Sequence, residues 1–328
     1  MRFLVTGASG FVGYRLAMRL AEIHGKEALQ LLVAPSPRTE EERRRLVALR
    51  DGGYDVLAVD LLSGVLDAGK FRAFDVCFHL AAFTETETES PLVRVNDVGT
   101  ERLLACLGER LKGKRIIYTS SVTVTDYLGS AGVPRTEYAR TKLEGERIVK
   151  IASERGGVVW TVLRLPTVMG PGFRPGGMFA VLAGGLKRNR LMTRLDWPGK
   201  VGLVFLDDAV AALIAMAADG VCENGIFSVG APESPTLDEL IEEIAGVLDV
   251  RRERIVLPAW FWALVRRITW LPWQRLLPYK LWVPVWRISN VVADSMVLDG
   301  APLNKSLGLL HMPLRSAVRH TYEATDRS

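Results

Sequence analysis

The sequence of 328 residues predicts an α/β fold, namely a Rossmann-type doubly wound parallel sheet with a smaller C-terminal substrate lobe. Three observations predict this fold. Short apolar runs alternate with helical patterns through the first half of the chain. A glycine-rich turn joins the first apolar run to the first helical pattern, and the strand–helix rhythm changes after Arg164. Continuous apolar runs are typical of strands that are buried on both faces of a parallel sheet.

The strands and helices are predicted in chain order as follows. The apolar runs predict strands at 2–6, 28–33, 55–59, 75–80, 115–120 and 158–164. Helical patterns lie between them; for example, Val12, Leu16 and Leu20 recur at helical spacing.

The second half of the chain starts with a glycine- and proline-rich loop at 170–177, where we expect part of a substrate pocket. Asp207 is expected to cap a helix that runs to about Gly220, and a strand is expected at 225–229. Thr236 and Glu239 form a capping-box pattern for a further helix. We therefore predict a first domain at 1–166, to which 201–230 returns, and a discontinuous lobe at 167–328.

Composition limits the classes of function. Hydrophobic residues make up 48% of the chain and charged residues 24%, which is typical of a globular protein. A net charge of +5 without a clustered basic patch does not predict a nucleic-acid partner. The cysteines Cys77, Cys106 and Cys222 show no metal-binding or disulfide spacing, so we expect no metal and a cytoplasmic location. We also expect no signal peptide and no membrane-spanning segment.

The glycine-rich turn at 6–13 is the strongest local motif. Gly7 permits a tight turn, Gly10 lets the backbone approach a pyrophosphate, and Gly13 lets helix and strand pack closely. The N-terminus of the following helix offers free N–H groups and a positive dipole end to phosphates. The motif predicts dinucleotide binding, and three more of its residues are expected to contact the cofactor: Ser9, Phe11 and Val12.

The residues after the second predicted strand bear on the choice between NAD and NADP. An acidic residue at this point would bind the ribose 2′-hydroxyl of NAD, but the chain has Ala34, followed by Ser36 and Arg38. We therefore favour NADP over NAD, with the alternative that Arg38 is only a solvated loop residue. Asp60, which ends the third predicted strand, is expected to accept a hydrogen bond from the adenine amino group, and its neighbour Leu61 to contact the cofactor.

A serine, a tyrosine and a lysine are the candidate catalytic residues. Tyr138 and Lys142 are four residues apart in a helical pattern, so their side chains share one helix face. We expect the ammonium group to lower the pKa of the phenol toward the working range, which would allow proton transfer during hydride transfer. Ser121, at the end of the fifth strand, is expected to hold the substrate oxygen, with Ser120 as the competing choice.

Taken together, these motifs resemble the extended short-chain dehydrogenase/reductase superfamily, the NAD-dependent epimerase/dehydratase group. The resemblance covers nearly the whole chain and includes the turn at 6–13, the sequences at 79–82, 95–100 and 163–172, and the sequence Phe-Leu-Asp-Asp-Ala at 205–209. It implies that Asn96 supports the active-site network, that Lys142 contacts the nicotinamide ribose, and that helices near 96–112 and 138–155 form a homodimer interface. It also implies further cofactor contacts at Leu80, Ala81, Ala82, Thr119, Pro166 and Val168.

The chain departs from the family pattern in three places. Sugar-nucleotide epimerases usually place an arginine shortly before the Asp207–Asp208 signature, and this chain has Lys-Val-Gly-Leu-Val at 200–204 instead. Ser121 and Tyr138 are only 17 positions apart, and Pro166 follows Leu165 where the usual order is Arg-Pro. The missing arginine weakens the case for a nucleotide-sugar substrate. The alternating Thr-Glu run at 84–89 is interpreted as a solvated loop, with a role at the substrate as the alternative.

The segment from Arg254 to Ala293 contains no acidic residue, six basic residues and six of the eight tryptophans. Phe261, Leu264, Ile268 and Leu271 are predicted to share one helical face, with Arg266 and Arg267 on the other. Three interpretations stay open: packing within the lobe, an apolar lid over a lipophilic substrate, or peripheral membrane contact through 258–287. The segment also loosely resembles the steroid-dehydrogenase-like branch of the superfamily.

Three hypotheses of function follow. The first is an NAD(P)-dependent reductase or dehydrogenase that acts on a lipophilic or ring-bearing ketone or secondary alcohol. The second is a nucleotide-sugar epimerase or dehydratase with retained NAD. The third is a non-catalytic dinucleotide-binding scaffold or sensor, which has no need for the Tyr138–Lys142 pair.

Overall fold

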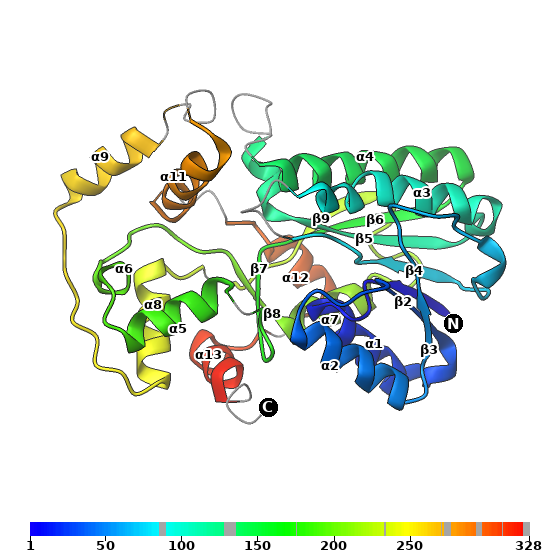
Figure 1. Cartoon of the computed structure of the whole chain (residues 1–328), viewed down its shortest axis with the longest axis horizontal. Helices are drawn as coiled ribbons and strands as arrows, with labels where there is room; N and C mark the ends of the chain where they lie inside the picture. The colour runs from blue at the N-terminus through cyan, green and yellow to red at the C-terminus, as the bar shows by residue number, and fades with distance from the viewer. Residues whose placement is uncertain are drawn as a thin grey trace.

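The computed structural model describes residues 1–84, 90–127, 136–174, 176–232, 234–269, 271, 277–292, 297–309 and 311–323. Its centre is a parallel sheet of seven strands in the order β3-β2-β1-β4-β5-β6-β9 (Figure 1). The strands are β1 (Phe3–Thr6), β2 (Leu29–Val33), β3 (Asp55–Ala58), β4 (Val76–His79), β5 (Arg115–Ser121), β6 (Val159–Leu165) and β9 (Gly225–Ser228). This order confirms the predicted Rossmann-type sheet, and the strand order reverses between β1 and β4, where such sheets bind ligands.

Helices cover both faces of this sheet (Figure 1). One face carries α1 (Phe11–His24), α2 (Glu40–Asp51) and α7 (Leu206–Ala215). The other face carries α3 (Val98–Leu107) and α4 (Glu137–Gly156). Each face has its own apolar core, built on one side around Leu16, Leu20 and Leu213 and on the other around Leu103 and Tyr118. The central strands are therefore buried on both faces, as their apolar sequences predicted.

The predicted bounds of the strands agree with the structure to within one or two residues, but α7 starts differently from the predicted helix. Phe205 is the residue before the first turn of α7, so the expectation that Asp207 caps this helix is wrong. Asp207 and Asp208 lie inside the first turn, where carboxylates interact favourably with the helix dipole. The helix also ends at Ala215, short of the predicted Gly220. The capping box of Thr236 and Glu239 is confirmed.

A smaller lobe follows the large sheet. It contains α5 (Met178–Lys187), α6 (Leu191–Arg194), α8 (Leu237–Val247), α9 (Ala259–Thr269), α11 (Tyr279–Val292) and α13 (Leu314–Glu323). A two-stranded parallel sheet of β7 (Thr167–Met169) and β8 (Leu203–Phe205) lies between the lobe and the large sheet (Figure 1). The chain returns to the large sheet for α7 and β9, and α12 (Ala301–Leu307) adds Leu303 to the core beside α1.

The aromatic segment forms α9 and α11. Trp262 is buried in α9, and Phe261 packs beside it against the lobe core. Leu264 and Ile268, which were predicted to share one helical face with Phe261, are exposed, so most of that face does not meet the lobe core. Residues 270 and 272–276 lie outside the described part of the chain. Among the described helices, none combines the length and the apolar character that crossing a bilayer requires.

Candidate active site

The turn at the end of β1 has the backbone that a dinucleotide needs. Gly7 has a φ of +70°, which favours glycine, and a side chain there would meet the backbone N of Ala81 at 2.8 Å. A Cβ at Gly13 would lie 2.2 Å from the Gly7 carbonyl oxygen. Gly10 precedes α1 and makes no side-chain capping bond, so no side chain of the turn covers the first N–H groups of the helix. The turn and helix therefore fit a pyrophosphate.

Two adjoining cavities meet at this turn. The smaller, of about 390 Å³, extends along the carboxyl ends of β2 and β3, and the larger, of about 440 Å³, extends over β5 and β6 toward the small lobe. All predicted site residues except Asn96 line one of them. The smaller cavity is lined by Ser9, Ser36, Asp60, Leu61 and Ala81. The larger cavity is lined by Phe11, Val12, Gly13, Thr119, Ser121, Tyr138, Lys142, Pro166 and Val168. Both are lined by Gly7, Gly10, Arg38, Leu80 and Ala82.

Arg38 is held at the boundary between the two cavities. Its guanidinium lies over the ring of Phe83, 4.5 Å from the ring centroid, and 3.8 Å from a carboxylate oxygen of Glu42. Its backbone N–H also donates to Glu42. Asp60 lines the same cavity, and its carboxylate accepts hydrogen bonds from the backbone of Leu62 and from Ser63, which lower its pKa. Arg38 is thus an exposed residue whose guanidinium contacts Phe83 and Glu42.

A buried polar network supports the floor of the site. His79 is fully buried between the hydroxyls of Thr6, at 2.7 Å, and Thr100, at 2.9 Å. Burial lowers the pKa of His79 to about 3, so the ring is neutral. Thr6 also accepts a hydrogen bond from the backbone of Ala81. The network therefore ties β1 and α3 to the segment that follows β4.

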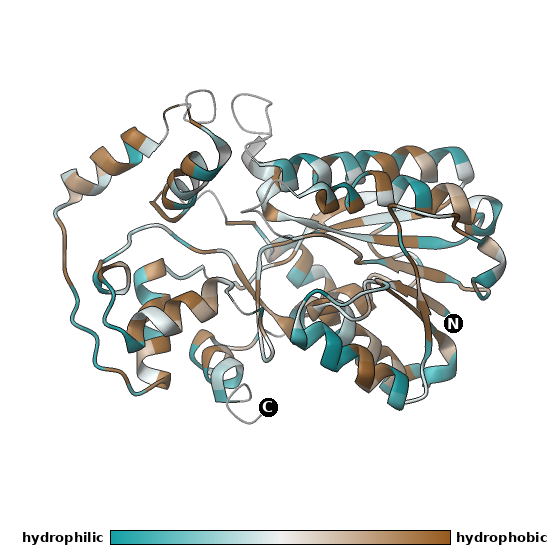
Figure 2. Cartoon of the chain, viewed as in Figure 1, coloured by the Kyte–Doolittle hydropathy of each residue, from teal (hydrophilic) through white to brown (hydrophobic). Residues whose placement is uncertain are grey.

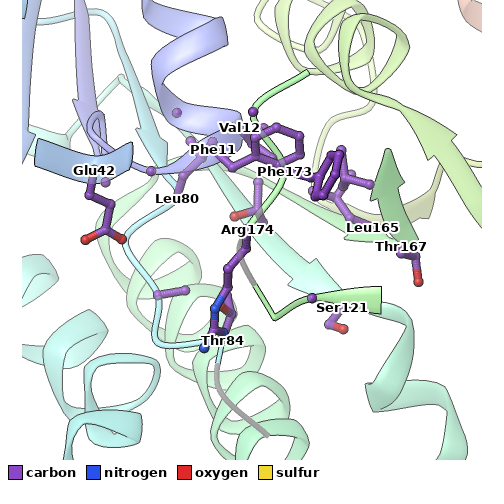
Figure 3. Close-up of a pocket in the computed structure, with 18 of the residues that line it drawn as sticks. Phe11, Val12, Glu42, Leu80, Thr84, Ser121, Leu165, Thr167, Phe173 and Arg174 are labelled. Atoms are coloured by element: carbon purple, nitrogen blue, oxygen red, sulfur yellow. The ribbon is translucent and has the colours of Figure 1, made fainter. Parts of the chain in front are cut away.

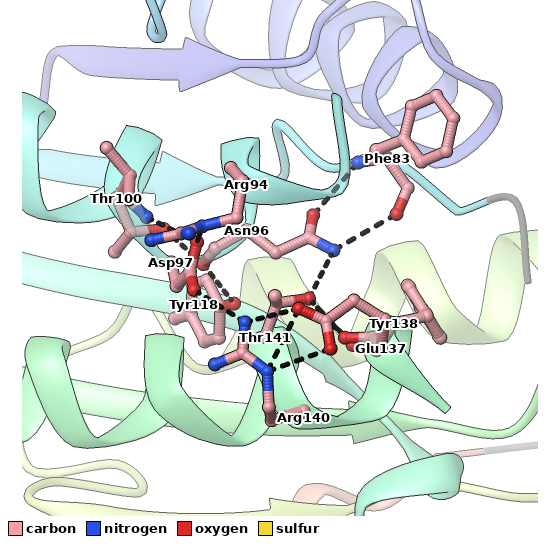
Figure 4. Close-up of polar contacts among 11 residues, drawn as sticks. Phe83, Arg94, Asn96, Asp97, Thr100, Tyr118, Glu137, Tyr138, Arg140 and Thr141 are labelled. Atoms are coloured by element: carbon pink, nitrogen blue, oxygen red, sulfur yellow. Dashed lines mark hydrogen bonds and ion pairs between the residues drawn. The ribbon is translucent and has the colours of Figure 1, made fainter. Parts of the chain in front are cut away.

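Asn96 belongs to this supporting layer. Its side chain is fully buried, accepts a hydrogen bond from the N–H of Phe83 at 2.9 Å, and donates to the carbonyl of Phe83 and to Thr141 (Figure 4). Thr141 lies on α4 between Tyr138 and Lys142. Asn96 therefore connects the segment after β4 to the helix that carries both candidate catalytic side chains.

Lys142 is buried beneath the larger cavity. Its ammonium donates to the carbonyl of Thr119 at 2.7 Å and lies 4.6 Å from the ring centroid of Tyr118. Burial lowers its pKa to about 7, and the carboxylate of Glu146, one helical turn away, acts in the opposite direction. Glu146 is itself held by Arg164 through two hydrogen bonds of 2.7 and 2.9 Å.

Tyr138 lies beside Ser121 at the end of β5. The pKa of Tyr138 is raised by burial and lowered by a hydrogen bond with Ser121, and the rise is the larger effect. The expectation that Lys142 lowers this pKa is therefore wrong for the structure as it stands, because the loss of water outweighs the hydrogen bond. Ser121 also accepts a hydrogen bond from the Thr123 hydroxyl at 3.0 Å. Ser120, the competing choice, is buried and its hydroxyl has no hydrogen-bond partner among the described residues.

The far wall of the larger cavity comes from residues that the sequence did not single out. Phe173 lies within the glycine-rich loop, Met178 and Phe179 follow it, and all three line the cavity. Figure 3 shows Phe173 among the lining side chains. Arg174 also lines it. Arg45 on α2 donates to the Gly172 carbonyl at 2.6 Å and thus links the loop to the large domain. The glycines had indicated a pocket loop, and only the fold shows which side chains it contributes.

Two stretches of interest lie outside the described residues. They are 85–89, which holds most of the Thr-Glu run, and 128–135, which lies between Ser121 and Tyr138. Lys200, in the stretch where the sequence pattern of sugar-nucleotide epimerases led us to expect an arginine, is exposed and does not line the cavity, and the nearby strand at 203–205 is buried.

Comparison with known proteins agrees with this geometry. The sequence model of the NAD dependent epimerase/dehydratase family matches residues 3–230. An uncharacterized UDP-glucose epimerase, YtcB of Bacillus subtilis, is 24% identical over 75% of this chain and 83% of its own length. The 3beta-hydroxysteroid-dehydrogenase/decarboxylase isoform 2 of Arabidopsis thaliana is 24% identical over 98% of this chain, which spans 61% of that protein.

Among solved structures, UDP-glucuronic acid 4-epimerase of Bacillus cereus, crystallised with NAD, has the same fold. Its TM-score is 0.75 at 18% identity, over 100% of this chain and 97% of the epimerase. The relatives are dehydrogenases, epimerases and dehydratases, so a non-catalytic scaffold is not supported. The chain belongs to the NAD-dependent epimerase/dehydratase family, the extended short-chain dehydrogenase/reductases.

Proposed function

We propose that the protein is an NADP-preferring reductase or dehydrogenase that interconverts a ketone and a secondary alcohol on a lipophilic or ring-bearing substrate. The observation that carries the proposal is the Ser121–Tyr138 pair beside a cavity that also contains the glycine turn. In this proposal the Tyr138 hydroxyl is the proton-transfer group, and it is supported by the cavity that Tyr138 and the glycine turn both line.

Each residue has a separate role in this proposal. Ser121 donates to the substrate oxygen and holds it against Tyr138, whose hydroxyl gives or takes the proton. Lys142, fixed by the Thr119 carbonyl, orients the cofactor ribose. The cofactor, when bound, supplies or accepts the hydride. His79 and Asn96 are positioning residues, because they hold the cavity floor and α4 without lining the cavity.

The preference for NADP is argued from charge. No carboxylate follows β2 directly, and the guanidinium of Arg38 is held by Phe83 at the cavity where the adenosine ribose would lie. A guanidinium matches a 2′-phosphate by charge and by its paired donors. Glu42 is a competing partner for Arg38, so the phosphate has to displace or share that contact.

The substrate class is argued from the cavity wall. Phe173, Met178 and Phe179 give the far wall an apolar, partly aromatic surface. The similarity to a 3beta-hydroxysteroid-dehydrogenase/decarboxylase supports a lipophilic substrate. Lys200 is exposed and does not line the cavity, and β8 is buried, so neither of them supplies a cation for a diphosphate there.

A nucleotide-sugar epimerase with retained NAD is the second candidate. Arg174 in the wall of the cavity favours it, as do the similarities to UDP-sugar epimerases. The two functions differ in what happens to the cofactor. A reductase consumes added NADPH as it turns over, whereas an epimerase returns its NAD to the starting state and shows no net consumption.

The decisive experiment compares Tyr138→Phe with wild type in cofactor binding and in turnover of a panel of ketones and alcohols. The variant should lose at least about a hundredfold in kcat, because the proton-transfer group is gone, while its Kd for NADPH changes less than twofold. Tyr54→Phe is the control: it removes the hydroxyl of a tyrosine between α2 and β3 that lines neither cavity. This variant should leave kcat and the Kd for NADPH unchanged. Full activity of Tyr138→Phe would exclude the proposed mechanism.

The quaternary structure proposed with this function is a homodimer formed through α3 and α4. These helices pack side by side on one face of the sheet, and Ile151 of α4 is 48% exposed (Figure 1). Light scattering of wild type should give the mass of a dimer, and Ile151→Asp should give a monomer.

A further inference from the structure

The outward faces of α9 and α11 combine apolar and basic side chains. On α9, Trp260, Leu264 and Ile268 follow one another at intervals of four residues and are 68%, 48% and 45% exposed. At 100° per residue, these positions fall within 80° of one another, and Arg267 falls 20° from Trp260 on the same face. Soluble proteins rarely expose such a stripe without a binding partner.

This orientation is fixed by the opposite face of the helix. Trp262 packs against Trp197, with 5.0 Å between ring centroids, and its indole N–H donates to Asp196 at 3.3 Å. Phe261 and Val265 pack against the lobe core from the same side. Because the buried face is already occupied, the helix cannot turn Trp260 inward without losing these contacts.

The neighbouring helix repeats the pattern. α11 contacts α9, buries Trp282, and exposes Leu281 and Ile288. Lys280 and Arg287 are exposed on the same helix. Figure 2 shows apolar residues along both helices, at the edge of the smaller lobe.

The positive charge of the outward faces of α9 and α11 indicates an anionic partner. From Arg254 to Ala293 the sequence has no acidic residue. Within the described chain, no carboxylate forms an ion pair with Arg266, Arg267 or Lys280. We propose that the outward faces of α9 and α11 bind the surface of an anionic lipid bilayer, with Trp260, Leu264 and Ile268 in the interface and the basic residues among the headgroups.

Other occupants fit these observations less well. A second copy of the chain, related by a twofold axis, would bring two basic surfaces together without a carboxylate on either. A lid over the substrate would have to contact the larger cavity. No described residue of α9 or α11 lines either cavity. A bilayer accepts tryptophan and leucine side chains and supplies the negative charge at the same time.

The test is co-sedimentation of the full chain with vesicles of phosphatidylcholine containing about 30% phosphatidylserine, compared with phosphatidylcholine alone. The protein should bind the anionic vesicles, and binding should weaken as added salt shortens the range of electrostatic attraction. Arg266→Gln and Arg267→Gln should each lower the partition coefficient about fivefold. Leu264→Ser/Ile268→Ser should lower it at least about tenfold.

The matched control is Ile23→Ser/Leu191→Ser, which changes equally exposed side chains on α1 and α6 and should bind vesicles as wild type does. Thermal unfolding and NADPH binding should be unchanged in all variants, which separates this test from that of the proposed function. Absence of binding to the anionic vesicles at low salt, or an equal loss in the control, would overturn the proposal. The proposal would also be overturned if wild type did not bind vesicles but formed a dimer that Leu264→Ser/Ile268→Ser dissociates. A second copy of the chain would then cover the surface.

Discussion

At the scale of single residues, Lys142 has a strongly lowered pKa. Its ammonium is buried, and burial lowers its pKa from 10.5 to about 7. A lowered lysine pKa means that the unfolded chain binds more protons than the folded chain between these two values. The charged lysine therefore destabilises the fold most below pH 7, and the penalty fades as the pH rises.

We therefore predict that Lys142→Met changes stability in a pH-dependent way. The free energy of unfolding of the variant minus that of wild type should be about 2 to 3 kcal/mol larger at pH 6 than at pH 9. The reason is that wild type must keep a buried charge at the lower pH. Urea unfolding at both pH values measures this difference. Lys150→Met, an exposed lysine of the same helix, is the control and should show no comparable pH dependence. An equal effect of Lys142→Met at both pH values would contradict the lowered pKa.

In the proposed function, the preference for NADP depends on Arg38. Arg38→Ala should weaken NADPH binding about ten- to a hundredfold, because a charge-assisted contact to the 2′-phosphate is lost, and leave NADH binding within twofold. Fluorescence titration with each cofactor measures both constants. Arg43→Ala, on the exposed side of α2, should change neither constant. A wild-type protein that binds NADH more tightly than NADPH would refute the assignment of Arg38.

The sequence predicted which candidate side chains come together better than it predicted their electrostatics. That Ser121 and Tyr138 line one cavity could be predicted, because the end of a parallel strand and the first turn of the next helix meet at one sheet edge. The direction of the Tyr138 pKa could not, because it depends on how much water the surrounding side chains exclude. Arg45 and Phe173 were missed for the same reason, since only the folded loop places them at the cavity.

At the scale of elements, the packing of α4 on β5 sets the position of the helix that carries Tyr138 and Lys142. Gly145 makes this packing possible, because a Cβ there would lie 2.2 Å from the Tyr118 hydroxyl oxygen and 2.6 Å from the Asn96 carbonyl oxygen. We predict that Gly145→Ala lowers the free energy of unfolding by about 3 kcal/mol and reduces turnover, since α4 must move away from the sheet.

Gly246 provides the control for this substitution. It lies in α8 with open space around the position of a Cβ. Gly246→Ala should therefore raise stability by about 0.5 to 1 kcal/mol, through the higher helix propensity of alanine. Denaturant unfolding of both variants measures the contrast, and similar effects of the two would contradict the close packing of α4.

Predictability also differed among elements. The strands of the large sheet were predicted to within one or two residues, because burial on both faces requires continuous apolar runs. The orientation of α9 was not, because its tryptophans and leucines occur on both sides of the helix and periodicity alone does not show which side meets the core. The neighbouring side chains of the lobe, Trp197 and Asp196, decide the orientation.

At the scale of the whole molecule, the chain passes more than once between the domain of the large sheet and the smaller lobe. The first 166 residues provide six of the seven strands of the large sheet, but the core on the α1 face is completed by α7 and α12. The sequence could indicate this return through the apolar helix after Asp207. It could not show that α12, near the C-terminus, belongs to the same core, because that contact has no local sequence signal.

This topology predicts that residues 1–166 do not fold alone. Without α7 and the residue after it, the fragment loses the buried apolar side chains of Leu206, Val210, Leu213 and Met216 from its core. Their burial contributes about 6 to 12 kcal/mol to the free energy of unfolding, which is comparable to the whole stability of a typical domain. The fragment should therefore show no cooperative thermal transition and should bind a hydrophobic dye, whereas the full chain unfolds cooperatively. A second fragment, 1–230, keeps α7 and β9 and should regain part of the native circular dichroism. A fragment 1–166 that melts cooperatively and binds NADPH would show instead that the sheet and its first helices are sufficient, and that α7 contributes little to the core it covers.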